Sequence, residues 1–150
     1  MYEGGIKTPM VAMWPGKIKA GSTTSHISAF WDVLPTISEM VKAETPDNID
    51  GISFLPTLFA GKKQKTHDYM YWEFHAENGK QAVRQGKWKA VRLNVLTKAK
   101  TVTELYDLEQ DPSETKNIAA QYPEKVKELE LLMDKSRTES ETFPFYSAIK

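Results

Sequence analysis

The second half of the chain carries an alternation of side chains that constrains the fold more than any other feature. The alternating positions are Met70, Trp72 and Phe74 against Tyr69, Tyr71, Glu73 and His75. A period of two with many aromatic residues is typical of a β-strand. Asn78-Gly79 follows and is a strong hairpin signal. Further strand-like segments occupy 81–84, 86–93 and 104–108. Segments so closely spaced predict a four-stranded antiparallel meander.

We expect one face of this meander to be solvated and the other to be covered, as is common in antiparallel sheets. The polar face would carry Lys87, Lys89 and Arg92, and the apolar face Trp88, Ala90 and Val91, brought together by a twist or bulge.

A helix predicted near the C-terminus would cover the apolar face. Pro123 stands where a helix tolerates a first-turn proline. The apolar residues at helical spacing are Val126, Leu129, Leu132 and Met133. Because such a stripe must pack on an apolar partner, we expect this helix to lie on the meander.

The first part of the chain follows a different pattern. Residues 8–16 are apolar without alternation and predict a buried strand, although no neighbouring strand of that type follows. Residues 28–41 have helical spacing interrupted by Pro35, so we expect a short helical turn and a helix that restarts near Leu34, with Asp32 as its cap. The basic run at 62–65 is interpreted as a solvated linker.

Composition excludes several classes of function. The chain has no cysteine, so it forms no disulfide, thiolate zinc site or thiol nucleophile. Its 20 basic and 20 acidic side chains cancel, and no apolar run approaches the ~20 residues of a membrane span. We therefore expect neither nucleic acid nor a membrane as a partner. The three histidines lack metal-ligand spacing, so no metal or cofactor is expected within this chain.

His75 is the best candidate for a binding residue. It follows the aromatic strand and precedes a turn, and binding residues are commonly placed on strand ends and loops. A structural histidine, held by a hydrogen bond, is the alternative that this position leaves open.

Several short segments of the chain form an ordered series of motifs. Residues 2–9 read as Y-E-G-G-x-R-x-P, with Lys7 in place of the arginine, and 14–16 read as W-P-G. The other blocks are 32–36 (D-x-x-P-T), 50–56 (D-G-x-S-x-x-P), 71–73, 82–84, 86–89, 104–108, 111–114 and 117–119. Taken in this order, the blocks resemble the C-terminal end of arylsulfatase-type sulfatases, in which arginine is usual at the position of Lys7.

The resemblance implies an α+β chain. Residues 1–61 would be the end of an alkaline-phosphatase-like α/β domain, and 62–66 a linker. Residues 67–150 would be a small four-stranded antiparallel sheet packed on a long C-terminal helix. The lone apolar strand at 8–16 would then be the closing strand of the larger domain.

The resemblance also implies a function for a longer parent protein. That parent would hydrolyse sulfate esters of carbohydrates or aryl compounds, in the periplasm or outside the cell. It would use calcium and a formylglycine nucleophile, made from Cys or Ser in a C/S-x-P/A-x-R motif. Because that motif and the calcium ligands are absent, this chain is expected to be inactive without the N-terminal catalytic part. Its own contribution would be structural closure and pocket shape, with His75, Trp72 and Lys80 as candidate substrate-binding residues.

Two other hypotheses remain open at this point. The chain could be a free-standing glycan-binding or scaffold module that uses a sulfatase-derived fold, or an unrelated small α+β interaction protein. A free-standing module would have no reason to keep exposed apolar side chains in its first 60 or so residues, so a large apolar patch there would favour the sulfatase hypothesis.

Overall fold

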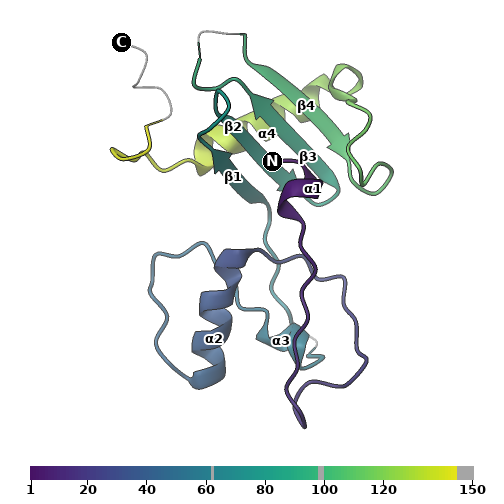
Figure 1. Ribbon diagram of the computed structural model, residues 1–150, viewed down its shortest axis with the longest axis vertical. Helices are drawn as coiled ribbons and strands as arrows, with labels where there is room; N and C mark the ends of the chain where they lie inside the picture. Colours follow the sequence, from purple (N-terminus) through teal and green to yellow (C-terminus); the bar gives the residue numbers. More distant parts are fainter. Residues whose placement is uncertain (62, 98–99, 145–150) are drawn as a thin grey trace. The chain divides into compact units, whose positions relative to one another are not determined.

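A four-stranded antiparallel sheet is the largest element of the structure, a computed structural model that describes residues 1–61, 63–97 and 100–144 (Figure 1). Its strands, β1 (Met70–Phe74), β2 (Lys80–Gln85), β3 (Trp88–Leu93) and β4 (Val102–Asp107), lie in the order β1-β2-β3-β4, and each pairs antiparallel with the next. The predicted four-stranded meander is therefore confirmed.

The contacts divide the chain into two units, which we call the sheet unit and the helical unit. The sheet unit is Met1–Thr8 with Asp68–Lys150, and the helical unit is Pro9–His67. The division of the parent protein into 1–61, 62–66 and 67–150 stays a prediction; in this structure the first eight residues group with the sheet. Lys62 of the predicted linker and residues 145–150 of the predicted last domain lie outside the described residues.

A long helix covers one face of the sheet, as expected. This helix, α4 (Pro123–Ser136), begins at its proline and buries Leu129 and Met133. The core residues that pack together between α4 and the strands are Val83, Ala90, Leu105, Leu129 and Met133. A short 3-10 turn, η2 (Ala119–Gln121), leads into α4.

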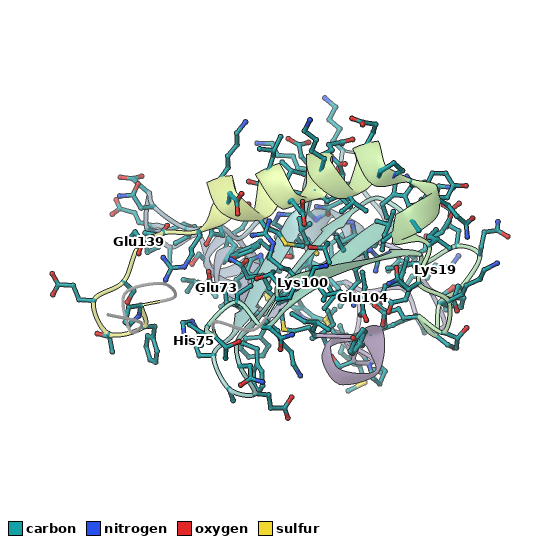
Figure 2. All side chains as sticks on the ribbon, turned by 90° about the horizontal axis from the view of Figure 1, so that it is seen from above. Lys19, Glu73, His75, Lys100, Glu104 and Glu139 are labelled. Atoms are coloured by element: carbon teal, nitrogen blue, oxygen red, sulfur yellow. The ribbon has the colours of Figure 1, made fainter. Side chains whose placement is uncertain are left out.

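The opposite face is covered as well, and the predicted solvated face is wrong. Helix α1 (Glu3–Ile6) and the residues before it lie on that face, across the sheet from α4 (Figure 2). The core cluster there contains Ala82, Val91, Tyr106 and Leu108, with Met1, Tyr2, Trp72 and Leu93 packed against it. The β2–β3 and β3–β4 registers run without a bulge, so Ala90 and Val91 belong to opposite faces.

Lys89 and Arg92, expected in solvent, are both buried. Lys89 is 0% exposed, and its Nζ lies 2.9 Å from a carboxylate oxygen of Glu3 and 2.9 Å from one of Glu114. The backbone N–H of Glu3 also donates to Glu114. Two buried carboxylates around one ammonium offset its desolvation and fix the N-terminal segment on the sheet. Arg92 is 7% exposed and turns toward α4.

The helical unit confirms the interrupted helix. A 3-10 turn, η1 (Phe30–Asp32), leads directly into α2 (Val33–Val41), and a short helix, α3 (Leu55–Leu58), follows. Asp32 caps differently from the prediction. It makes no side-chain bond at the start of α2, and its buried carboxylate instead accepts from the N–H of Ala29 at 2.7 Å and of Ile52 at 2.8 Å. His67 Nε2 lies 2.8 Å from the same carboxylate.

The buried strand predicted for 8–16 is wrong. These residues form no strand, and Met10, Val11 and Met13 are 58%, 94% and 85% exposed. A strand needs neighbours to satisfy its backbone, and every strand among the described residues belongs to the sheet unit. The predicted linker is anchored in part, because Gln64 accepts from the N–H of Thr57 at 3.0 Å and donates to the carbonyl of Ser53 at 2.8 Å.

We predict that the buried ammonium is a major contributor to the stability of the sheet unit. Replacing Lys89 by Met leaves Glu3 and Glu114 buried without their shared cation, which should lower the free energy of unfolding by about 3–5 kcal/mol. Urea denaturation measures this loss. The control is Lys87→Met, because Lys87 pairs with Asp107 at 2.7 Å but is 38% exposed and should cost much less. Equal losses in the two variants would contradict the assignment.

Candidate functional site

His75 lies immediately beyond the end of β1 and is held by a neighbouring carboxylate. Its Nε2 is 3.1 Å from Oε2 of Glu73, and its ring meets Phe143 edge-on with 5.6 Å between the ring centroids. The imidazole is 30% exposed and the Glu73 side chain 21%. Figure 2 shows Glu73 and His75 side by side at one end of the sheet. His75 is thus both anchored and open to solvent, as a residue that contacts a ligand must be.

Trp72 and Lys80 are the other candidates. They lie on the face of the sheet opposite the one that carries Glu73. Because side chains alternate along a strand, Trp72 points away from the face that carries Glu73 and packs against the cluster beneath the N-terminal segment. Lys80 pairs with Glu77, and its Nζ lies 5.9 Å from the centroid of the Phe74 ring. The structure therefore does not gather His75, Trp72 and Lys80 into one group.

The structure instead brings His75 into contact with a row of polar side chains that the sequence analysis did not identify. The strand register places Glu73, Gln81, Arg92 and Thr103 in one row across all four strands, on the face beneath α4. Each charged or amide group in this row is hydrogen-bonded or ion-paired. The alternation of side chains along a single strand does not reveal such a row. The row becomes visible only when the register between the strands is known.

Glu73 is the residue on which these contacts converge. One of its carboxylate oxygens, Oε1, accepts from the Tyr71 hydroxyl at 2.5 Å and lies 3.2 Å from Nε of Arg137. Its other oxygen, Oε2, faces His75. Arg137, just beyond the end of α4, is only 5% exposed and also pairs with Glu139 at 2.7 Å.

The contacts continue from Glu73 toward α4 through Tyr71, which lies on the same face as the row. The Tyr71 hydroxyl accepts from the amide of Gln81 at 2.7 Å, and the Gln81 carbonyl oxygen accepts from Arg92 at 3.1 Å. Arg92 also donates to Asp134 at 2.7 Å and to the carbonyl of Glu130 at 3.2 Å, both on α4. Burial, and next the Glu73 carboxylate, raise the pKa of Tyr71, so this phenol keeps its proton.

A second polar cluster lies on the other face, under the N-terminal segment. The hydroxyls of Tyr2 and Tyr106 both donate to Oε2 of Glu104, at 2.6 Å and 3.0 Å. Burial raises the pKa of Tyr2 to about 12, and the hydrogen bond to Glu104 acts in the same direction. The same two causes raise the pKa of Tyr106.

These groups are able to bind polar ligands. An imidazole beside a carboxylate can exchange hydrogen bonds with hydroxyl, amine or sulfate groups. Among residues 1–61, 63–97 and 100–144, no group of three or more acidic or histidine side chains could hold a metal ion. No described helix is both long and apolar enough to cross a bilayer.

Comparison with known proteins identifies the family. The family model described as N-sulphoglucosamine sulphohydrolase, C-terminal, matches residues 1–140. An N-acetylglucosamine-6-O-sulfatase of Bacteroides thetaiotaomicron is 33% identical over 148 residues, which cover 91% of this chain and 26% of that protein. Arylsulfatase K of Xenopus laevis is 30% identical over 158 residues, which cover 99% of this chain and 28% of that protein.

A solved structure agrees with these matches. A protein in complex with its substrate, D-glucosamine-2-N,6-O-disulfate, matches with a TM-score of 0.67 and 29% identity, over 82% of this chain and 26% of that one. The fold and these matches define the class, which is the C-terminal part of a sulfatase. The chain belongs to the N-sulphoglucosamine sulphohydrolase C-terminal family. It spans only 26% and 28% of the two relatives compared above.

The half-buried phenol of Tyr2 predicts a specific dependence of stability on pH. Its pKa is about 10 in an unfolded chain and about 12 in the folded one, so the folded state retains a proton that the unfolded state loses between these values. The stability it contributes is fully present below pH 10 and is lost as the pH rises to 12. We expect the free energy of unfolding of Tyr2→Phe, measured with urea, to fall less steeply across this range than that of the wild type. Parallel slopes would refute this prediction.

Proposed function

We propose that this chain is the C-terminal part of an enzyme that hydrolyses sulfate esters, with sulfated carbohydrate as the main substrate class and aryl sulfates as a second. The observation that carries the proposal is the family match over residues 1–140. Relatives whose names specify a sulfated amino sugar, and the structure solved with a disulfated glucosamine, support carbohydrate. A periplasmic or extracellular location for the parent is part of this proposal.

Within that enzyme, the sheet unit would shape the substrate pocket, and His75 would contact the substrate. Three properties support His75: its place at the end of a strand, its partial exposure and its anchoring by Glu73. Lys80 remains a second candidate, because its ammonium could turn from Glu77, which is 68% exposed, toward a sulfate. Trp72 is the weakest of the three, since it packs against a core cluster.

The helical unit would pack on the N-terminal catalytic part of the same chain. Its exposed apolar side chains support this, and the most exposed are Met10, Val11, Met13, Phe30, Leu34, Ile37 and Val41, each between 51% and 94% exposed. Side chains of this kind, gathered in one unit, favour a buried position in a longer chain over a free-standing glycan-binding or scaffold module.

Calcium and formylglycine would belong to that catalytic part. Calcium takes six to eight oxygen ligands, and the described residues offer no cluster of acidic side chains suited to it. The sequence contains no cysteine and no C/S-x-P/A-x-R motif from which formylglycine could be made. The residues that the structure describes therefore do not fit calcium, and the sequence does not fit formylglycine.

The first prediction from this proposal is that the isolated chain has no sulfatase activity. The physical reason is that it brings neither a nucleophile nor a Lewis acid to a sulfate ester. The measurement is hydrolysis of a chromogenic aryl sulfate and of glucosamine-6-sulfate by highly purified chain, against a heat-treated sample. Turnover above that background would show that the catalytic groups lie within these 150 residues.

The second prediction concerns His75 in the full-length protein. If the imidazole contacts substrate, His75→Ala leaves a polar group of the substrate without a partner. The free-energy cost of such an unpaired group is about 1–3 kcal/mol. The value of kcat/KM should then fall roughly ten- to a hundred-fold, while the melting temperature changes little. A purely structural histidine would give the opposite result: normal kinetics on the folded enzyme and a lowered melting temperature. Trp72→Ala serves as the comparison. Because this substitution removes packing against a core cluster, it should lower the melting temperature.

A further inference from the structure

The hydrogen bonds that link Arg92 to Glu73 beneath α4 each have one possible direction. Arg92 can only donate, so the Gln81 atom that faces it at 3.1 Å is the carbonyl oxygen. The Gln81 amide nitrogen therefore faces Tyr71 and donates to the phenol oxygen at 2.7 Å. With that oxygen accepting, the single phenol proton is directed to Glu73. The donor and acceptor capacities of these groups thus determine each direction.

The same reasoning reaches the imidazole. Oε1 of Glu73 accepts the hydrogen bond of the Tyr71 hydroxyl and faces the cationic Arg137 at 3.2 Å, so this carboxylate acts as an acceptor. Its other oxygen, Oε2, lies 3.1 Å from Nε2 of His75. Because a carboxylate can only accept, Nε2 must carry the proton in this contact.

We propose that Glu73 is a positioning residue that holds the His75 ring in one orientation and in its Nε2–H tautomer. In that tautomer Nδ1 of the neutral ring is an acceptor, which suits a sugar hydroxyl or N–H group and not a sulfate oxygen. The benefit to a bound substrate rests on the proposed function, whereas the tautomer itself does not depend on it.

A charge-neutral replacement of Glu73 gives the sharpest test. Glutamine has the same shape but only one oxygen, and both Tyr71 and Arg137 require an acceptor on the Oε1 side. The glutamine oxygen should therefore turn to that side and its NH2 group should face His75. The neutral ring would then have to accept at Nε2, so Glu73→Gln should switch His75 to the Nδ1–H tautomer.

Nuclear magnetic resonance of this chain labelled with nitrogen-15 histidine measures the outcome. Spectra recorded at alkaline pH distinguish the two tautomers of a neutral imidazole. The chain has three histidines, and His26 and His67 belong to the helical unit, so they serve as internal references. Glu128→Gln is the matched control, because Glu128 lies on α4 and pairs with Lys125.

We expect the Nε2–H form and a slowly exchanging Nε2 proton for His75 in the wild type and in Glu128→Gln. We expect the Nδ1–H form in Glu73→Gln. An unchanged Nε2–H tautomer in folded Glu73→Gln would overturn the proposal. A wild-type Nε2 proton that exchanges as fast as in a free imidazole would also overturn the proposal. This measurement uses the wild-type chain alone, so it does not depend on the folding of a variant. Because no substrate is used, failure of the tautomer assignment does not contradict the proposed function. Conversely, normal kinetics of His75→Ala would not contradict the tautomer assignment.

Discussion

The arrangement of the sheet unit depends on the two ion pairs that the buried Lys89 ammonium makes. A charge inside a sheet must be neutralised where it lies, and its two carboxylates come from Glu3 and from Glu114. Holding Glu3 there also places Met1 and Tyr2 over the adjoining apolar cluster. The sheet thereby gains a second covered face, while α4 covers the first. The free edge at β1 is where Glu73 and His75 lie, supported by side chains from beneath α4.

The elements with strong local signals could be predicted from the sequence. Asn78 and Gly79 both have positive φ in the turn between β1 and β2, as the hairpin signal required. Pro123 opens α4, and Pro35 accompanies the change from η1 to α2. The order of the strands followed from their close spacing, because short connections favour antiparallel neighbours.

The predictions that failed depended on partners distant in the sequence. Lys89 and Arg92 look like surface residues until Glu3, Glu114 and Asp134 are placed beside them. Residues 8–16 look like a strand because their composition is apolar, yet composition does not supply a neighbouring strand. For the candidate site, the position after a strand is enough to select His75 as a candidate, and its role stays a prediction. The roles of Glu73, Tyr71 and Arg137 were not found, because they depend on the strand register and on the end of α4.

The first residues of the chain make their contacts with some of the most distant ones. Glu3 reaches Lys89 across 86 positions, and Tyr2 reaches Glu104 across 102. The loop-closure entropy of such separations grows slowly, by about 0.6 kcal/mol for each doubling of length, but distant pairing slows folding. During synthesis the N-terminal segment therefore leaves the ribosome long before its binding surface exists. The whole helical unit is translated in between, so completion of the sheet unit must be a late event in folding.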